Sequence, residues 1–335
     1  MAGMEHRFLG RTGVRVSRLG FGVMSFGGWA DQAESARQFA RCREAGINLF
    51  DAADVYNEGR SEEILGRLIG EAGCRDQVVL ASKAYFPTGE DVNARGSSRY
   101  HLVRAVEASL RRLGTDRIDL FYLHHHDEET AIDETLRAVD DLVRQGKVLY
   151  PAASNFAAWQ VMKALGEAER RGLAPVVAVQ PMYNLVKRQA EVEILPMCRS
   201  EGLAAITYGA TAAGLLTGKY AAGRRPGSGR LVENDMYRSR YGEPAYFEAA
   251  ERFTALAAER GHHPAALAVA WVASHPAVTS VLLGARNTEQ LEPQLGALEI
   301  AMDEELRAAV SALWPAPPPP TDRTEERTDH TYGQR

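Results

Sequence analysis

The segment LFDAADVYNEGRSEEILG (residues 49–66) begins as an apolar strand and ends as an amphipathic helix. A carboxylate, Asp51, and a phenol, Tyr56, stand five residues apart where the strand gives way to the helix. A buried strand followed at once by a helix is the repeating unit of parallel α/β proteins, whose functional side chains gather at the carboxyl ends of the strands. The segment therefore predicts a fold class and a place for the functional groups.

The same unit recurs along the whole chain. The apolar runs are nearly continuous rather than alternating, which is typical of parallel strands buried on both faces. The eight predicted strands cover residues 18–26, 48–54, 78–84, 118–126, 148–155, 176–184, 203–210 and 278–285. Eight strands separated by helices, without a change of composition midway, predict an α/β fold, a (β/α)8 TIM barrel, in preference to a doubly wound sheet.

Helical periodicity fills the intervals between the strands. The predicted helices cover residues 33–45, 61–70, 98–114, 133–146, 156–171, 190–201, 246–260, 264–274 and 287–296. Ser61, followed by Glu63, is a candidate N-cap for the second helix. Gly114 is expected to end the third.

Three segments do not fit the repeat. Residues 6–17 predict an N-terminal β-hairpin that turns at Thr12-Gly13 and closes the barrel floor. Residues 212–245, after the seventh strand, predict a long loop rich in glycine and arginine, a kind of connection that is more often functional than idle. Residues 315–335 are Pro-rich and then charged, which predicts a flexible tail after a barrel domain of residues 1–314. The Pro at 151 predicts a local irregularity in the fifth strand.

The composition narrows the class of protein. The chain has 335 residues, a net charge of −5 and 45% hydrophobic residues, which gives no reason to expect nucleic acid as a partner. Cys42, Cys74 and Cys198 are widely spaced and odd in number, which argues against a disulfide scaffold or a zinc site. No segment resembles a signal peptide or a membrane span. We therefore expect a cytoplasmic protein that does not interact with membranes.

Polar side chains stand at the carboxyl ends of successive predicted strands. Asp51 and Tyr56 follow the second strand, Lys83 ends the third, and the histidines from His124 follow the fourth. An ammonium group near a phenol lowers the phenol's pKa, and a carboxylate keeps the ammonium charged. A tyrosine so placed becomes a proton donor near neutral pH. The three consecutive histidines could instead bind a metal, but no third ligand has comparable spacing, and we expect no metal.

Seven motifs in this order resemble the aldo-keto reductase family over roughly residues 6–313. The resemblance is closest to the branch that contains aryl-alcohol dehydrogenase-like proteins and potassium-channel β subunits. The motifs are DAADVYNEGRSEEILG, ASK, YLHHHD, SNF, VQPMYN, GLLTGKY and GARNTEQL. The resemblance implies NADP(H)-dependent reduction of a carbonyl by a tetrad of Asp51, Tyr56, Lys83 and His124, with Tyr56 as proton donor.

The resemblance also implies a set of cofactor contacts without a Rossmann glycine loop. The residues implied are Val23, Met24, Asp51, Ser154, Asn155, Gln180, Tyr208, Gly209, Ala210, Thr211, Gly214, Lys219, Gly284, Arg286, Gln290 and Gln294. Among them, Tyr208 matches the aromatic side chain that stacks on the nicotinamide, and Arg286 matches the adenosine-phosphate site. The chain departs from the family pattern at Gly209-Ala210-Thr211, where Ser-Pro-Leu is usual, and at Val23, where threonine is common.

Several functional alternatives stay open at this level. The substrate is a small carbonyl compound (an aldehyde, ketone or keto-sugar), and related sequences include reductases of nucleotide-linked keto-deoxysugars. A regulatory subunit of the channel-β type, which holds NADP(H) with little turnover, is a second possibility. Trp29, Tyr56, His124 and His125 are candidates for the substrate pocket. The arginines of the 212–245 loop (Arg224, Arg225, Arg230, Arg238 and Arg240) could meet a phosphorylated substrate or the phosphates of the cofactor.

Overall fold

Eight parallel strands close into a barrel in the computed structural model, which describes residues 3–220 and 226–322. This confirms the predicted TIM barrel and all eight predicted strands. Each strand pairs in parallel register with both neighbours, and the order around the barrel is β10 (Val278–Leu283), β3 (Leu19–Gly22), β4 (Leu49–Asp51), β5 (Val79–Ala84), β6 (Ile118–Leu123), β7 (Val148–Ser154), β8 (Ala178–Gln180) and β9 (Ala204–Thr207).

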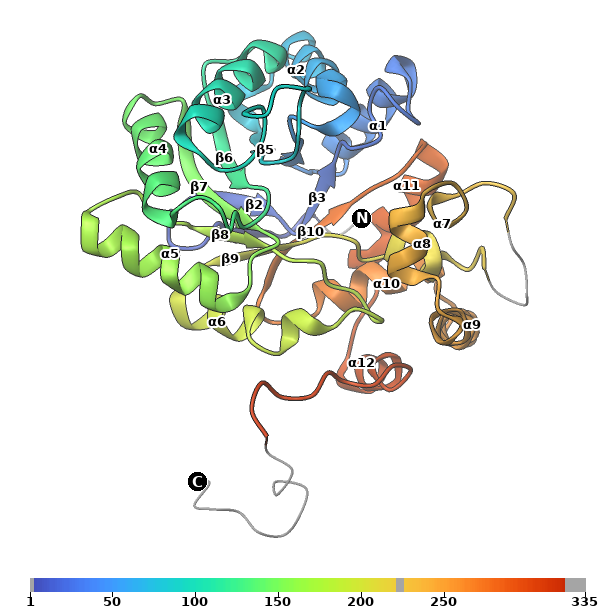
Figure 1. Ribbon diagram of the computed structural model, residues 1–335. Coiled ribbons are helices and arrows are strands. Elements are labelled where there is room, and N and C mark those ends of the chain that lie inside the picture. The colour runs from blue at the N-terminus through green and yellow to red at the C-terminus, as the bar shows by residue number, and fades with distance from the viewer. Residues whose placement is uncertain (1–2, 221–225, 323–335) are drawn as a thin grey trace.

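Helices surround the barrel (Figure 1). They are α1 (Gln32–Glu44), α2 (Arg60–Glu71), α3 (Arg99–Leu113), α4 (Ile132–Arg144), α5 (Ala158–Arg171), α6 (Ile194–Glu201), α7 (Arg230–Glu233), α8 (Asp235–Tyr241), α9 (Pro244–Glu259), α10 (Pro264–Ala273), α11 (Thr288–Leu295) and α12 (Glu304–Ser311). Gly114 ends α3 in the left-handed conformation (φ 60°), as predicted. The predicted cap at Ser61 is wrong. Gly59 (φ 87°) precedes α2 instead, and the Ser61 hydroxyl donates to the carbonyl of Val23 at 2.7 Å.

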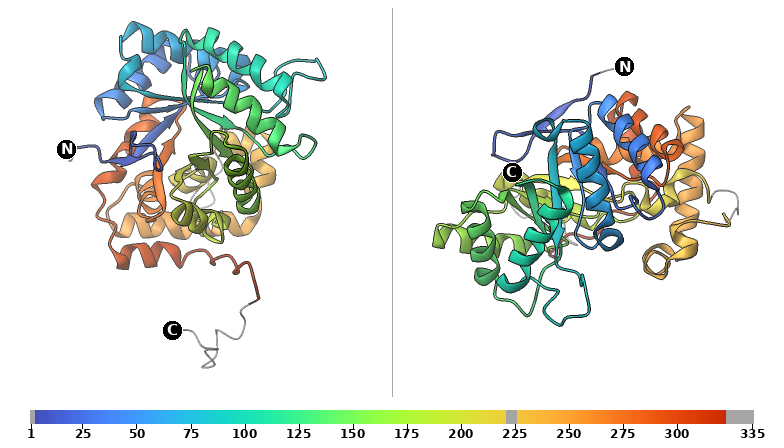
Figure 2. Two further views of the ribbon diagram at one scale, coloured as in Figure 1. Left: turned by 90° about the vertical axis from the view of Figure 1, so that its left-hand side faces the viewer. Right: turned by 90° about the horizontal axis from the view of Figure 1, so that it is seen from above.

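The predicted N-terminal hairpin is present and closes one end of the barrel (Figure 2). Strands β1 (His6–Phe8) and β2 (Arg15–Ser17) pair antiparallel across a turn that contains Thr12 and Gly13. Leu9 and Val16 are fully buried against residues near the starts of the barrel strands, such as Leu49 and Val79. The hairpin therefore seals the floor and leaves the opposite end open for a site.

The predicted irregularity at Pro151 is wrong. Pro151 pairs with Phe121 of β6, the register continues through Ala152 and Ala153, and the Pro151 carbonyl accepts the Val177 amide at 2.9 Å. Proline lacks a backbone donor but keeps its acceptor, so β7 accommodates it without a shift of register.

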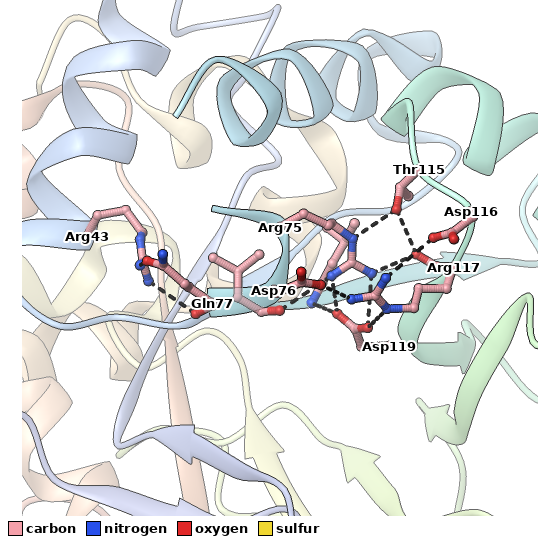
Figure 3. Close-up of polar contacts among 10 residues, drawn as sticks. Arg43, Arg75, Asp76, Gln77, Thr115, Asp116, Arg117 and Asp119 are labelled. Atoms are coloured by element: carbon pink, nitrogen blue, oxygen red, sulfur yellow. Dashed lines mark hydrogen bonds and ion pairs between the residues drawn. The ribbon is translucent and has the colours of Figure 1, made fainter. Parts of the chain in front are cut away.

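A polar network secures the amino-terminal ends of β5 and β6 (Figure 3). The guanidinium of Arg75 donates to both oxygens of Asp119 at 2.8 and 2.9 Å. The same carboxylate accepts the Leu80 amide of β5 at 2.7 Å. A bidentate pair of this kind fixes geometry as well as charge, so adjacent strands are fixed to each other at the end of the barrel remote from the strand carboxyl ends.

The connection after β9 is more ordered than the sequence predicts. Residues 212–217 form a 3-10 helix, and α7 and α8 follow within the predicted loop. The Asn234 side chain caps α8 by accepting the Met236 amide at 3.0 Å. Leu231, Tyr237 and Tyr241 are buried, and these apolar anchors explain why the short helices hold their place. Arg224, Arg225 and tail residues 323–335 lie outside the described residues.

Candidate active site

Asp51, Lys83 and Tyr56 meet at the carboxyl ends of β4 and β5. The fully buried ammonium of Lys83 donates to the Asp51 carboxylate, to the Ala52 carbonyl at 2.7 Å and to the Tyr56 hydroxyl at 3.4 Å. An ammonium has three protons to donate, and each has an acceptor here. The arrangement orients a buried positive charge towards the phenol.

A short left-handed turn directly after Tyr56 fixes this residue near the end of β4. Tyr56 begins a 3-10 helix (Tyr56–Gly59) in which Asn57 and Glu58 have φ of 49° and 59°. The Asn57 amide fixes the turn by donating to the carbonyls of Met24 and Phe26, both at 2.8 Å. Non-glycine residues with positive φ are uncommon and need such support. The interval between Asp51 and Tyr56 is covered by residues 52–55, and the Tyr56 amide closes it by donating to the Ala53 carbonyl at 3.2 Å.

The histidine that follows β6 lies beside the phenol. His124 is 7% exposed, and its ring meets the Tyr56 ring edge-on with centroids 6.0 Å apart. Burial, together with the charge of Lys83, holds the pKa of His124 well below its ordinary value. A neutral imidazole can donate a hydrogen bond to a carbonyl oxygen without carrying charge.

Burial reverses one expectation about Tyr56. Burial raises the pKa of Tyr56 above its ordinary value, while the Lys83 ammonium opposes the rise. The net direction is therefore opposite to the lowering predicted from the sequence, because removal of the phenolate from water outweighs the neighbouring charge. Burial acts to lower the pKa of Lys83, but the Asp51 carboxylate raises it overall. The phenol holds its proton and the amine its charge at neutral pH.

A chain of hydrogen bonds joins the ends of β7, β8 and β9 to this group. The Gln180 amide donates to Asp51 Oδ2 at 2.8 Å, and the Ser154 hydroxyl donates to the Gln180 carbonyl at 3.0 Å. Asn155 donates to the His124 carbonyl at 2.9 Å and accepts the Tyr208 hydroxyl at 2.8 Å. The ends of six strands, β4 to β9, therefore contribute to one polar rim.

A cavity of about 450 Å³ opens on this rim. Its lining includes Tyr56, His124 and His125, which were predicted for the substrate pocket, and the tetrad carboxylate Asp51. The fourth tetrad residue, Lys83, is fully buried behind this lining. The predicted cofactor residues that also line it are Met24, Ser154, Asn155, Gln180, Tyr208, Gly209, Ala210, Thr211, Gly284 and Gln294.

Apart from Lys83, two predicted residues line neither this cavity nor the second one beside it. Val23 is fully buried, and its backbone bonds Asp51 and Ser61, so it supports the site from beneath. Trp29 is 40% exposed, and the guanidinium carbon of Arg286 lies 4.5 Å from the centroid of the Trp29 ring. Trp29 therefore belongs to the outer rim.

A second cavity of about 310 Å³ adjoins the first and gathers positive charge. It is lined by Lys219, Arg230 and Arg286, with the predicted residues Gly214 and Gln290 beside them. Burial and the two arginines lower the pKa of Lys219. Gly214 has a φ of 91°, which favours glycine, and a Cβ there would lie 2.8 Å from Lys219 Nζ, so the ammonium would have to shift. Three mutually repelling cations around one cavity suit a ligand with phosphate groups.

Several lining residues of the main cavity were not predicted from the sequence. Phe86 meets the His124 ring with centroids 4.9 Å apart, and Tyr237 and Tyr241 enter from α8. Phe86 follows β5 by two residues, so its position after a strand could have indicated it. The α8 residues carried no such signal, because their segment had no predicted element.

Residues 3–220 and 226–322 contain neither a metal-binding cluster nor a membrane-spanning helix. No cluster of three or more His, Cys, Asp or Glu side chains is arranged there to hold a metal ion. Within the same ranges, no helix is both long and apolar enough to cross a membrane.

Comparison with known proteins identifies the family of this chain. The model of the Aldo/keto reductase family matches residues 18–315. The uncharacterized oxidoreductase YrpG of Bacillus subtilis (strain 168) is 38% identical over 327 residues, which cover 94% of this chain and 97% of YrpG. Probable voltage-gated potassium channel β subunits of Oryza sativa subsp. japonica and Arabidopsis thaliana are 37% and 36% identical over 303 residues, 89% of this chain and 92% of each relative. With a family match that spans the whole barrel, this chain is an oxidoreductase that belongs to the aldo/keto reductase family.

Proposed function

We propose that this protein reduces the carbonyl group of a small aldehyde, ketone or keto-sugar with NADP(H), and that Tyr56 donates the proton. One observation carries the proposal. The Lys83 ammonium, buried and bound to Asp51, donates to the Tyr56 hydroxyl at the base of a cavity that His124 also lines. These residues combine a proton donor, its charge partner and a neutral hydrogen-bond donor in one place.

Each residue has a separate task in this proposal. The bound cofactor supplies the hydride. Tyr56 transfers its proton to the carbonyl oxygen as that oxygen gains negative charge. Lys83 stabilises the phenolate that remains, and Asp51 keeps Lys83 charged. His124, neutral because of burial, donates a hydrogen bond that orients the carbonyl.

The second cavity supports the choice of NADP(H). Lys219, Arg230 and Arg286 would hold its phosphate groups, and Gln290 and Gln294 lie beside them. Tyr208, with Asn155 and Gln180 below it, would hold the nicotinamide end in the main cavity. Thr211 lines both cavities and offers a hydroxyl where the usual serine is absent.

The experiment compares two tyrosine variants with wild type. Tyr56→Phe should lower NADPH-dependent reduction of an aromatic aldehyde by at least about 10²-fold, since a positioned acid contributes about 10²–10⁴-fold. Its Kd for NADPH, followed by fluorescence, should change less than about threefold. Tyr100→Phe, an exposed control on α3, should match wild type. A Tyr56→Phe protein with most of its turnover would contradict the assignment.

A second candidate follows from the channel-β relatives. Their names describe them as probable channel subunits, and their identity to this chain is nearly that of YrpG. A subunit of this kind would bind NADPH and work through a protein partner. Tight NADPH binding without turnover across a panel of aldehydes, ketones and nucleotide-linked keto-sugars would favour it.

A further inference from the structure

We propose that the substrate carries a negatively charged group, a carboxylate or a phosphate, in addition to its carbonyl, and that Arg240 of α8 recognises it. The proposal rests on the carbonyl reduction proposed above and names its substrate class. It comes from the one part of the main cavity that the barrel strands do not build.

Arg240 faces the same cavity as the reacting groups. It lines the main cavity with Tyr56 and His124, and its guanidinium lies 5.7 Å from the centroid of the Tyr237 ring. Burial raises the pKa of Tyr208 to about 12, and the charge of Arg240 opposes that rise. The guanidinium and the Tyr208 side chain therefore belong to the same cavity, and the positive charge acts on its interior.

Arg240 has no counter-ion in the part of the chain that the structure describes. No hydrogen bond or ion pair is formed by its guanidinium there, although its neighbour on α8, Arg238, pairs with Asp235. Glu233, the nearest acid of α7, is engaged by Arg286 at 2.7 Å. A guanidinium with five donors and no partner is suited to bind a carboxylate or phosphate.

The charges that line the main cavity also favour an anionic substrate. Among its described lining residues, Asp51 is the one carboxylate, and Lys83 neutralises it. Arg230 lines both cavities and its guanidinium stands 5.4 Å from the ring centroids of Trp29 and of Tyr237. In the function proposed above, Arg230 holds the cofactor phosphates in the second cavity. This division leaves Arg240 as the cation for the substrate. The tyrosines and methionines around it offer no competing charge.

The kinetic test uses substrates matched in shape. We would measure kcat/KM with NADPH for 4-carboxybenzaldehyde against 4-methylbenzaldehyde, and for glyceraldehyde 3-phosphate against glyceraldehyde. Wild type should prefer the charged member of at least one pair by about tenfold or more. The pair with the larger preference tells carboxylate from phosphate. Arg240→Gln should lower kcat/KM for that charged member by about 10- to 100-fold and change the uncharged member less than about threefold. Arg240→Lys should retain part of the preference.

Two controls separate the possible failures. Arg238→Gln removes the same charge from the exposed side of α8 and should match wild type. The NADPH Kd should be the same in Arg240→Gln as in wild type. If it weakens, or if the charged-to-uncharged ratio is unchanged, the assignment of Arg240 is overturned.

A binding measurement distinguishes failure of this inference from failure of the proposed reduction. Calorimetry of the NADPH-bound protein with benzoate and with inorganic phosphate needs no turnover. Binding by wild type that is lost in Arg240→Gln supports the anion site even in a protein that reduces no aldehyde. Equal binding by both proteins, or none by either, overturns it.

Discussion

Removal of the buried ammonium should separate stability from catalysis. Lys83→Met leaves the Asp51 carboxylate, 3% exposed, with the Gln180 amide as its remaining side-chain donor. Breaking a buried ion pair from one side costs about 3–5 kcal/mol. For 335 residues, an unfolding entropy of about 2.1 cal/mol/K per residue turns this cost into a fall in Tm of about 4–7 °C.

The double variant Asp51→Asn/Lys83→Met removes both charges and should restore most of the lost stability, because a neutral pair of similar volume leaves no uncompensated ion. Both variants should still reduce aldehydes at least about 10²-fold more slowly than wild type. Thermal unfolding followed by circular dichroism, with NADPH oxidation in parallel, gives the two readouts. A double variant that regains activity would show that the ammonium is not needed. A single variant with wild-type Tm would refute the buried pair.

Three further predictions concern the cofactor region and the buried acid behind the site. Arg286→Ala should weaken NADPH binding about 10- to 150-fold, with little effect on NADH binding. Glu233→Gln frees Arg286 from its ion pair and should tighten NADPH binding by less than about tenfold. Titration of cofactor fluorescence measures both dissociation constants. Saturating NADPH should slow trypsin cleavage within residues 226–241 if α7 and α8 cover the cofactor, and an identical digest with and without NADPH would contradict this. Burial and then Glu62 raise the pKa of Asp54 to about 8, so the folded protein binds a proton there that the unfolded chain releases near pH 4, and stability is lost as pH rises from about 4 to about 8. Asp54→Asn should remove this contribution to the pH dependence of the unfolding free energy, measured by chemical denaturation at several pH values. An unchanged pH dependence would show that Asp54 is ionised in the folded protein.

The regular parts of the fold were predictable because each rests on a local signal. The near-continuous apolar runs indicated strands buried on both faces, and all eight form the barrel. The polar residues at their ends were expected to converge, and Asp51, Tyr56, Lys83 and His124 do lie together. Geometry explains the success, because closing a parallel barrel brings every strand's carboxyl end to one rim.

The failures came from contacts that no local pattern encodes. Ser61 looks like a cap, yet its hydroxyl is drawn to the Val23 carbonyl across 38 residues. For Trp29 the sequence left the substrate pocket and the barrel rim equally open; its ring contacts the guanidiniums of Arg230 and Arg286, from distant segments, and a role in substrate binding stays a prediction. Helix α8 has only seven residues and is stabilised by burial of Tyr237 and Tyr241 rather than by periodicity.

The residues proposed for the reaction lie at the strand ends, whereas the residue proposed for substrate recognition lies on the connection after β9. This difference explains why the sequence predicts the class of reaction better than the substrate. The proposed proton donor and its partners are held by β4, β5 and β6, whose register fixes them whatever the substrate. Arg240 instead stands on a helix that touches the barrel through a few buried tyrosines, so its replacement changes no strand. Substitution within α8 can therefore alter the charge presented to a substrate while Tyr56 and Lys83 stay in place. On this reasoning, Arg240→Glu should reverse the preference between charged and uncharged aldehydes and leave both the Tm and the NADPH Kd close to their wild-type values. A lost preference together with a lower Tm and a higher NADPH Kd would instead show that α8 is part of the framework that holds the catalytic residues.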